Sequence, residues 1–442
     1  MKEQEASAVK TGKKINPKFN PFPGLRPFSI SESHLFFGRE GQSDEILKNL
    51  AEHHFVAVMG ASGSGKSSLI YCGLVPILHG GFITEAGSRW RVVHSRPGNA
   101  PIDNLAQAIS ESDLKKDALA EEKAVQKNIT STVLRSSSLG LIEAVKQLNT
   151  EKKENVLIII DQFEELFRFK SSVEDEAKSV NESTAFVKLL LAAIHQKEAP
   201  IYVVITMRSD FIGDCAQFHE LTRAINDSNY LIPRMTRDDF KNAVEGPVAV
   251  GGGQISSRLV QQLLNDVGDN QDQLPILQHA LMRTWDFWIE NRVDDYEEID
   301  IEHYDAIGKM ESALSEHANE AYDELSESQK RVCESLFKTL TEKGGDNRGI
   351  RHPTQVTKIA EIAQSEPNEI IKVVENFRAA GRSFLMPAPH VPLNASSVID
   401  ISHESLMRIW DRLKVWVDDE ANAVNMYLRL SEASEMYQEG KT

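Results

Sequence analysis

The sequence contains little cysteine. Its three cysteines, Cys72, Cys215 and Cys333, stand far apart among 442 residues, without a CxxC pair or a pair of histidines at metal-ligand spacing nearby. The sequence therefore predicts neither a disulfide framework nor a zinc site. Because unpaired cysteines are typical of reducing compartments, we expect a cytoplasmic protein.

Long hydrophobic runs are also lacking. The longest ones, such as residues 156–160 and 201–205, have the length of β-strands, whereas a helix that crosses a bilayer needs about 18 or more apolar residues. The N-terminus has lysines, but the apolar segment of a secretory signal does not follow them. We therefore expect neither a membrane partner nor export.

The sequence also has fewer positively charged than negatively charged residues. The 49 lysines and arginines are outnumbered by 66 aspartates and glutamates, which gives a net charge of −17. A net negative charge opposes the attraction to phosphate backbones on which non-specific nucleic-acid binding depends. We therefore expect no nucleic-acid partner.

The composition is otherwise that of a globular protein with several domains. Hydrophobic residues make up 41% of the chain, and at about 100 to 200 residues per domain its length predicts two to four domains. Residues 1–19 are rich in lysine and poor in large apolar side chains, which indicates a flexible tail. The proline-rich segment that follows suits an extended strap on a folded surface.

Residues 20–232 are predicted to form an α/β core that includes this strap. Short apolar runs alternate with helical patterns, and they predict strands at residues 54–59, 90–94, 156–160 and 201–206. Continuous apolar strands interleaved with helices indicate a parallel sheet covered on both faces.

The rest of the chain is predicted to be mainly helical. Residues 233–295 form a helical lid, with helices at residues 236–248, 256–267 and 274–291. Residues 296–420 are predicted to form a winged-helix domain, in which helices at 311–325, 327–342 and 367–379 precede short strands at 383–386 and 398–401. Residues 421–442 begin a C-terminal helical connector, which indicates that the chain is cut from something longer.

A glycine-rich loop joins the first predicted strand to a helix at residues 66–78. It matches the P-loop pattern G-x-x-x-x-G-K-[ST] with Gly60, Ala61, Ser62, Gly63, Ser64, Gly65, Lys66 and Ser67, and we add Ser68 to the nucleotide-binding set. The glycines allow positive φ angles, so that backbone N–H groups can point at phosphate oxygens. We expect Lys66 to reach the β- and γ-phosphates and Ser67 to ligate Mg²⁺. The alternative is a strand-to-helix turn that binds nothing.

Acidic residues follow the strand at residues 156–160. Asp161 has the position of a Walker B aspartate, which holds Mg²⁺ through water. Glu164 is our first choice for the group that polarises the attacking water, and Glu165 is the reserve. The alternative is that either glutamate belongs to the solvated first turn of a helix, where the helix dipole favours it.

Arg208 follows the strand at residues 201–206. Ligands of open α/β sheets bind at the carboxyl ends of the strands, so Arg208 is a candidate sensor of the γ-phosphate. The alternative is a salt bridge to Asp210 or Asp214.

These motifs occur in an order that resembles the novel STAND NTPases, signal-transduction ATPases similar to the NB-ARC and NACHT classes and to AAA+ ATPases. The resemblance extends from about residue 20 to residue 417. Besides the P-loop, it rests on FFGRE at 36–40, Trp90 with RPG at 96–98, DQFEELF at 161–167, TMRSDF at 206–211, LP at 274–275 and HESL at 403–406.

The resemblance implies contacts with the nucleotide beyond the P-loop. It places Phe37, Gly38 and Arg39 against the adenine and ribose, and Pro275 near the base. It also implies that His403 contacts the β-phosphate of ADP and locks a closed form, although a core or capping histidine is an equal alternative. Gln162 stands where AAA+ motors usually carry a glutamate, which implies slow hydrolysis or the use of Glu164.

The fold that we predict is a P-loop NTPase parallel sheet core followed by an α-helical lid and a winged-helix domain. The implied function is an ATPase switch that uses ATP or ADP with Mg²⁺, is closed with ADP, and opens and assembles with ATP. Its partners would be C-terminal sensor repeats or another protein, and further copies of itself. The alternatives are an AAA+-like remodelling ATPase and a partner-binding module with structural nucleotide. We interpret Gly251 to Gly253 as a flexible connector between lid helices rather than a second phosphate loop.

Overall fold

The computed structural model describes residue 16 and residues 19–81, 89–113, 119–148, 154–168, 176–268, 273–294, 296–343 and 349–439. Most of the predicted tail, at residues 1–15 and 17–18, lies outside the described residues. The chain divides into two compact units, Phe28–Phe240 and a second one that joins Met1–Pro27 to Lys241–Thr442. Each unit is described by itself.

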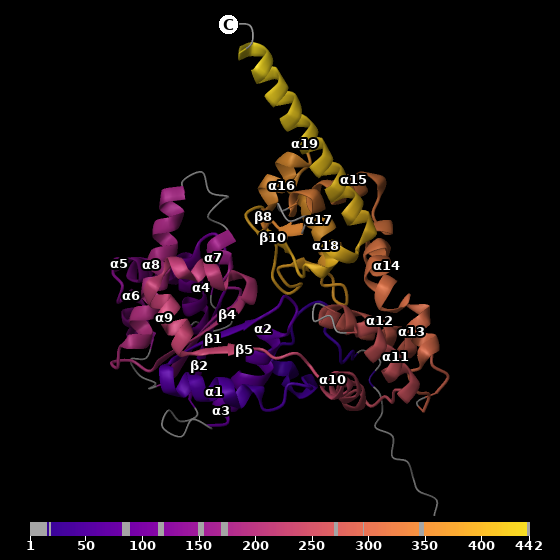
Figure 1. Ribbon diagram of the computed structural model, residues 1–442, viewed down its shortest axis with the longest axis horizontal. Helices are drawn as coiled ribbons and strands as arrows, with labels where there is room; N and C mark the ends of the chain where they lie inside the picture. The colour runs from indigo at the N-terminus through magenta and orange to yellow at the C-terminus, as the bar shows by residue number, and fades with distance from the viewer. Residues whose placement is uncertain are drawn as a thin grey trace, which may run out of the picture. The chain divides into compact units, whose positions relative to one another are not determined.

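The unit Phe28–Phe240 is built on a five-stranded parallel sheet (Figure 1). The strands are β1 (Phe55–Gly60), β2 (Trp90–Ser95), β3 (Asn155–Ile160), β4 (Ile201–Arg208) and β5 (Asn229–Leu231), in the spatial order β2-β3-β4-β1-β5. All neighbouring pairs run parallel. The predicted parallel α/β core is therefore confirmed, and β5 is a strand that the sequence pattern did not indicate.

Helices cover both faces of this sheet (Figure 1). Alternate strand residues pack on one face against α1 (Gln42–His53), the π-helical turn η2 (Leu69–Leu74) and α3 (Val75–His79). The other face packs against α4 (Pro101–Asp113), α6 (Gly140–Leu148), α8 (Glu176–His195) and α9 (His219–Asp227). In addition, α5 (Ala120–Ser136) packs on α4 and α6. Because both faces are buried, the strands are continuously apolar, which is why the sequence pattern revealed them.

The described residues of this unit also form four short elements. They are η1 (Ile30–Leu35), α2 (Lys66–Ser68), α7 (Glu165–Arg168) and the 3₁₀ segment η4 (Ser209–Gln217). The helix predicted at residues 66–78 is divided into α2, η2 and α3. Pro76 lies in the first turn of α3, and its missing N–H removes one bond of a continuous α-helical ladder.

The second unit begins with helices where the lid is predicted. They are α10 (Arg237–Val250), which runs across the boundary between the units, α11 (Ser257–Val267) and α12 (Leu274–Asn291). The short helix α13 (Ile301–Ala306) follows them, within the region predicted as the winged-helix domain. Gly251 to Gly253 connect α10 and α11, but a Cβ on Gly251 would lie 2.5 Å from the Trp285 ring. These glycines therefore permit close packing as well as a turn.

The N-terminal strap belongs to this second unit. Asn20 donates its side-chain amide to Met282 O at 2.9 Å and to Asp286 Oδ1 at 2.7 Å. Trp285 Nε1 donates to Phe19 O at 2.9 Å, and Leu25 lies in the core of the C-terminal helices. The strap is thus anchored on α12, about 260 residues later in the chain.

The C-terminal part combines helices with a small antiparallel sheet. The helices are α14 (Lys309–Asp323), α15 (Glu327–Thr339), α16 (Val356–Ile362), α17 (Pro367–Arg378), α18 (Ser405–Ile409) and α19 (Asp411–Glu439). The predicted hairpin forms from β9 (Leu385–Met386) and β10 (Val398–Ile401), and β8 (Thr354–Gln355) joins it in the order β8-β10-β9. A further pair is β6 (Thr341–Lys343) with β7 (Gly349–Arg351).

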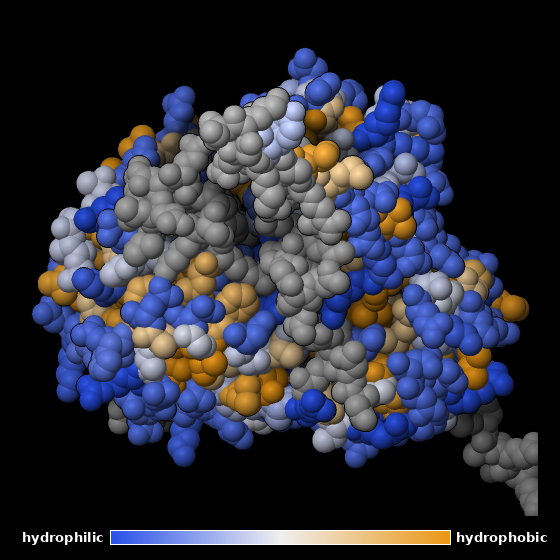
Figure 2. Space-filling view, turned by 45° about the horizontal axis from the view of Figure 1, so that its top comes forward, coloured by the Kyte–Doolittle hydropathy of each residue, from blue (hydrophilic) through white to orange (hydrophobic). Residues whose placement is uncertain are grey.

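The face of the molecule that Figure 2 shows is mostly polar. In the face that Figure 2 shows, hydrophilic side chains cover most of the coloured surface and hydrophobic ones lie in separate groups among them. Among the described residues, no helix combines the length and the apolar character needed to cross a membrane. The three cysteines are all buried thiols.

Candidate nucleotide-binding site

The glycine-rich loop joins β1 to α2, as its pattern predicts. Gly63 and Gly65 have φ angles of 71° and 86°, which favour glycine. Gly60 does not have a positive φ; instead, a Cβ on it would lie 2.7 Å from Ser64 Oγ. The expectation that all three glycines supply positive φ is therefore wrong for Gly60, which is needed for space.

The side chain of Lys66 lies back over this loop. Its Nζ donates to Gly60 O at 3.0 Å and to Ala61 O at 2.7 Å. Burial lowers the pKa of Lys66, while the nearby carboxylates of Glu164 and Asp161 act to raise it. The ammonium group is thus held at the loop that is expected to cradle phosphates.

Asp161 is the centre of the site. Its Oδ1 accepts hydrogen bonds from Ser67 Oγ at 2.7 Å and Thr206 Oγ1 at 2.6 Å. Its Oδ2 accepts from Arg96 Nε at 3.2 Å and Nη2 at 3.1 Å. Burial acts to raise the pKa of this fully buried carboxyl, but Arg96, His94 and the two hydroxyls lower it to about 2. Asp161 is therefore ionised at neutral pH.

The two candidate glutamates have different surroundings. Glu164 is buried, and its Oε2 accepts from Arg208 N at 3.4 Å. Among the charged neighbours of Lys66, Glu164 has the largest effect on the pKa of that lysine, which it acts to raise. Glu165 begins α7, and its Oε2 accepts from Gly98 N at 2.9 Å. Glu165 therefore contributes to holding the loop after β2, whereas Glu164 acts electrostatically on Lys66 of the P-loop.

Gln162 turns the chain immediately after Asp161. Its φ of 57° is left-handed, and its backbone N–H donates to Thr206 Oγ1 at 3.1 Å. The Thr206 hydroxyl thus accepts from Gln162 and donates to Asp161. This arrangement fixes the direction in which the residues after the Walker B strand leave the sheet.

Arg208 is paired with Asp210. Its Nε and Nη2 donate to the two carboxylate oxygens of Asp210 at 3.1 and 2.6 Å, and its guanidinium lies 5.6 Å from the centre of the Phe211 ring. The salt bridge considered above as the alternative for Arg208 is therefore present.

Comparison with known protein families decides the assignment of this arrangement. The family model described as "Novel STAND NTPase 1" matches residues 21–442. The chain belongs to the novel STAND NTPase 1 family. No curated protein matches this STAND sequence.

Several solved structures are similar to the STAND chain at low identity. The Orc1 protein of Aeropyrum pernix, solved in complex with DNA, is 12% identical, with a TM-score of 0.44 over 88% of this chain and 94% of that one. A Walker-type ATPase of Pyrococcus abyssi is 12% identical, with a TM-score of 0.40 over 87% and 98%. The RuvB branch-migration motor of Thermotoga maritima is 14% identical, with a TM-score of 0.36 over 87% and 97%.

The STAND motif at residues 36–40 lies against the P-loop. Arg39 is buried and donates through Nη2 to Ser64 O at 2.9 Å and through Nη1 to Pro233 O at 2.8 Å. Burial lowers the pKa of Arg39, and Asp239 and Tyr230 act to raise it. Gly38 has a φ of 81°, and a Cβ there would lie 2.4 Å from Asp239 O. The motif thus connects the P-loop to the segment after β5.

The remaining nucleotide-binding candidates are divided between the two units. Phe37 is half-buried beside Gly38, and the buried Ser68 hydroxyl accepts a bond from Phe28 N at 3.2 Å. Pro275 and His403 belong to the second unit. Pro275 lies in the first turn of α12, and His403 Nδ1 accepts from Ser405 N at 3.1 Å, a capping contact of the kind considered above.

Sequence reasoning missed the roles of Arg96 and Thr206. Both belong to motifs of the STAND resemblance, RPG and TMRSDF, but their side chains were assigned no function. Arg96 follows β2 and Thr206 lies near the end of β4, and both strands neighbour β3 in the sheet. The available signal was that polar residues at the carboxyl ends of neighbouring parallel strands meet at one edge.

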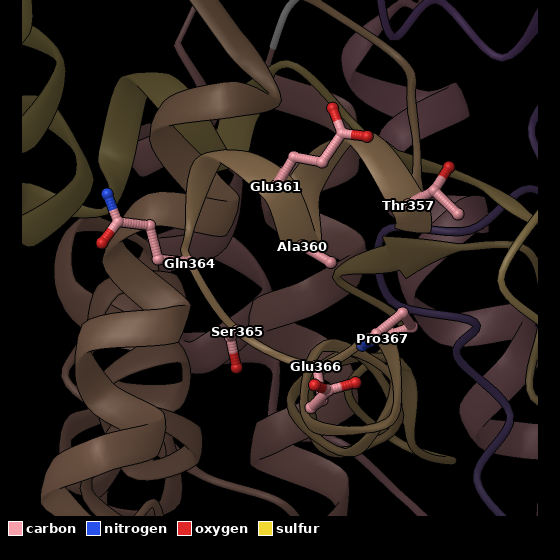
Figure 3. A pocket seen from close by; sticks show the side chains of 7 residues that line it. All are labelled: Thr357, Ala360, Glu361, Gln364, Ser365, Glu366 and Pro367. Carbon is pink, nitrogen blue, oxygen red and sulfur yellow. The ribbon is translucent and has the colours of Figure 1, made fainter.

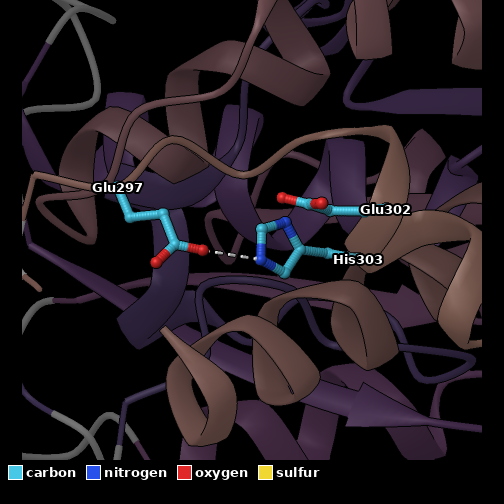
Figure 4. A group of neighbouring side chains, drawn as sticks. All are labelled: Glu297, Glu302 and His303. Atoms are coloured by element: carbon cyan, nitrogen blue, oxygen red, sulfur yellow. Dashed lines mark hydrogen bonds and ion pairs between the residues drawn. The ribbon is translucent and has the colours of Figure 1, made fainter. Parts of the chain in front are cut away.

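One side-chain cluster outside this site has the composition of a metal site. Glu297, Glu302 and His303 offer ligand atoms within 4.8 Å of one another (Figure 4). However, His303 Nδ1 accepts from Asp300 N at 3.0 Å, so its Nε2 carries the proton that it shares with Glu297 Oε1, also at 3.0 Å. The cluster is explained as the N-terminal cap of α13.

An open hollow of about 450 Å³ lies between α16 and the start of α17 (Figure 3). Its lining is small or polar and includes the carboxylates of Glu361 and Glu366. An acidic hollow does not favour a phosphate ligand. It adds no candidate site for nucleotide.

Proposed function

We propose that this protein is a STAND-type signalling switch that binds ATP and hydrolyses it slowly, with an ADP-bound closed form and an ATP-bound form that opens and assembles. The observation that carries the proposal is the bond of 2.7 Å between Ser67 and Asp161. It joins the two expected Mg²⁺ ligands directly beside the P-loop, because Ser67 lies in α2 after the loop and Asp161 follows β3.

The residues around this bond fit a Mg²⁺·nucleotide. Gly63 and Gly65 have the positive φ angles that turn N–H groups toward an anion, and Lys66 brings a cation to the loop. Ser67 and the ionised Asp161 supply oxygen ligands of the type that Mg²⁺ prefers. When bound, Mg²⁺ would polarise the phosphoryl oxygens and neutralise charge that develops there.

For hydrolysis, we assign the polarisation of water to Glu164, with Glu165 as the reserve. Glu164 is supported by its electrostatic effect on Lys66, whose pKa it acts to raise, and Glu165 is already bonded to Gly98. Arg208 would contact the γ-phosphate after leaving Asp210. Gln162, in place of a second Walker B carboxylate, supports a slow rate.

The switch also involves the second unit. We propose that residues 233–295 act as the lid, residues 296–420 as a winged-helix domain and residues 421–442 as a connector. The base and ribose would be enclosed by Phe37, Gly38 and Arg39, with Pro275 near the base. His403 would contact the β-phosphate of ADP. The partners would be C-terminal sensor repeats or another protein, in the cytoplasm, and the ATP-bound form would be a homo-oligomer.

The test combines nucleotide binding with the mass of the protein in solution. Lys66→Ala removes a cation from the phosphates, which lowers the affinity for ATP·Mg by about 10- to 100-fold, because hydrogen bonds to charged groups contribute about 1.5 to 3 kcal/mol. Lys48→Ala, an exposed lysine on α1, is the matched control and should bind as the wild type does. Calorimetric titration with ATP measures both.

Solution mass distinguishes the switch from its alternatives. We expect a monomer with ADP and a larger species with a non-hydrolysable ATP analogue. Fast turnover stimulated by assembly would instead favour a remodelling ATPase, and equal binding of a partner by Lys66→Ala and wild type would favour structural nucleotide. Wild-type ATP affinity in Lys66→Ala would contradict the P-loop assignment.

A further inference from the structure

The Arg96 guanidinium contacts one oxygen of the Asp161 carboxylate through two hydrogen bonds. It donates from Nε and Nη2 to Asp161 Oδ2, at 3.2 and 3.1 Å, while Ser67 and Thr206 donate to Oδ1. The carboxylate is fully buried, so this guanidinium supplies the positive charge that its burial demands.

The backbone of Arg96 is held in place, but its side chain retains access to water. Asn104 Nδ2 donates to Arg96 O at 3.3 Å and to Pro97 O at 2.9 Å, and Gly98 N donates to Glu165 Oε2 at 2.9 Å. The Arg96 side chain is 32% exposed, whereas that of Asp161 is 0% exposed. The guanidinium can therefore move outward from a fixed loop, whereas the carboxylate cannot follow it.

A Mg²⁺ ion held by Ser67 and Asp161 would bring a second cation to the carboxylate that Arg96 already neutralises. Both cations are attracted to the same carboxylate and repel each other, and a guanidinium stays protonated at any ordinary pH. We propose that Arg96 is an exchangeable counter-ion, which neutralises Asp161 until Mg²⁺ arrives with the nucleotide and takes its place. This inference rests on the proposed nucleotide site and assigns Arg96 as a positioning residue within it.

Such an exchange has a measurable consequence for the coupling between metal and nucleotide. With Arg96 on Asp161, the site presents no uncompensated carboxylate to the phosphates, so the protein can bind ADP without metal. A bound Mg²⁺ would compete with the guanidinium for the charge of Asp161, and this competition would reduce the gain in ADP affinity that the metal brings. Without the arginine, the bare carboxylate repels metal-free ADP, and the gain from Mg²⁺ becomes larger.

The experiment measures ADP affinity by calorimetry in excess EDTA and in excess Mg²⁺, and the ratio of the two is the coupling. In Arg96→Gln, which keeps an N–H donor but no charge, we expect the Mg²⁺-to-EDTA affinity ratio to rise about tenfold over wild type, equivalent to about 1.4 kcal/mol. Most of the change should be weaker binding in EDTA.

Further variants make the result specific. Arg96→Lys keeps one charge without the two-pronged contact, so its ratio should fall between those of wild type and Arg96→Gln. Arg135→Gln, which removes an ion-paired arginine on α5, is the matched control and should keep the wild-type ratio. In an Asp161→Asn background, Arg96→Gln should no longer raise the ratio, because the carboxylate that the arginine neutralises is absent.

An unchanged or lower ratio in Arg96→Gln would overturn the inference while leaving the nucleotide site intact. If Arg96→Gln does not melt cooperatively, Arg96→Lys decides, and a wild-type ratio there overturns the inference in the same way. A wild-type protein that binds ADP in neither condition would overturn the proposed function and this inference together. The two failures are thus distinguished by the wild-type titration alone.

Discussion

At the scale of single residues, Asp161 organises the site. Its two oxygens receive hydrogen bonds from three elements: α2 through Ser67, β4 through Thr206, and the loop after β2 through Arg96. The depressed pKa of this buried carboxyl, about 2, results from these partners acting against burial. The charge state that a metal ligand needs is thereby fixed by the fold itself.

The sequence predicted the identity of the central residues better than their contacts. Lys66, Ser67 and Asp161 were identified because a P-loop pattern and an apolar strand that ends in aspartate are local signals. The pairing of Arg96 with Asp161 joins residues that are 65 positions apart. A local pattern does not reveal which of several arginines makes such a contact.

The choice between the two glutamates leads to a prediction at this scale. Glu164→Gln should retain nucleotide binding and lose turnover by about 100-fold or more, because general-base groups contribute about 10² to 10⁴ in rate. Glu165→Gln is the matched control and should retain turnover within a few-fold, since its carboxylate holds Gly98. Single-turnover ATP hydrolysis measures both variants, and a loss confined to Glu165→Gln would show that the assignment is reversed.

At the scale of elements, the sequence revealed what is long and continuously apolar. β1 to β4 and α12 lie within a few residues of their predicted bounds. β5 and β8 have three and two residues, too few to show a period, and their strand character depends on neighbours supplied by distant parts of the chain. The packing of the strap on α12 was also unpredictable, because it joins residues that lie far apart in the sequence.

The strap provides a prediction for this scale. Asn20→Ala removes two side-chain bonds to α12, so the unit that contains α12 should lose about 1 to 2 kcal/mol of unfolding free energy, at about 1 kcal/mol per hydrogen bond. Urea unfolding followed by tryptophan fluorescence measures this loss, because Trp285 is bonded to the neighbouring Phe19.

Asn49→Ala is the matched control for this experiment. Its amide donates to Asn229 O at 3.2 Å within the other unit. It should leave the transition of the α12 unit unchanged. An equal loss in both variants would mean that the two units unfold together and that the strap has no separate role.

At the scale of the whole molecule, the proposed nucleotide contacts are divided between two units. The P-loop, Asp161 and Glu164 belong to one, and Pro275 and His403 belong to the other. A protein organised in this way can couple the state of its nucleotide to the arrangement of its units, provided that each unit contributes contacts whose strength depends on the nucleotide.

His403 tests this coupling. If it contacts the β-phosphate of ADP, His403→Ala should release ADP about 5- to 150-fold faster and populate the assembled form without ATP, since a bond to a charged group contributes about 1 to 3 kcal/mol. Ser405→Ala is the matched control, because it disturbs the same cap of α18 without removing the imidazole. Stopped-flow ADP release and solution mass should show a change in His403→Ala alone; equal values in all three proteins would leave His403 as a capping residue.

The burial of the three cysteines determines how the arrangement of the two units can be measured. Burial raises the pKa of Cys215 to about 12 and that of Cys333 well above its ordinary value, so their reactive thiolates are scarce at neutral pH. Cys72 is also buried, and its thiol donates to Ser29 O at 3.2 Å. The native thiols are therefore poor targets for maleimide reagents. Spectroscopic labels on one introduced surface cysteine in each unit can report the distance between the units with ADP and with ATP.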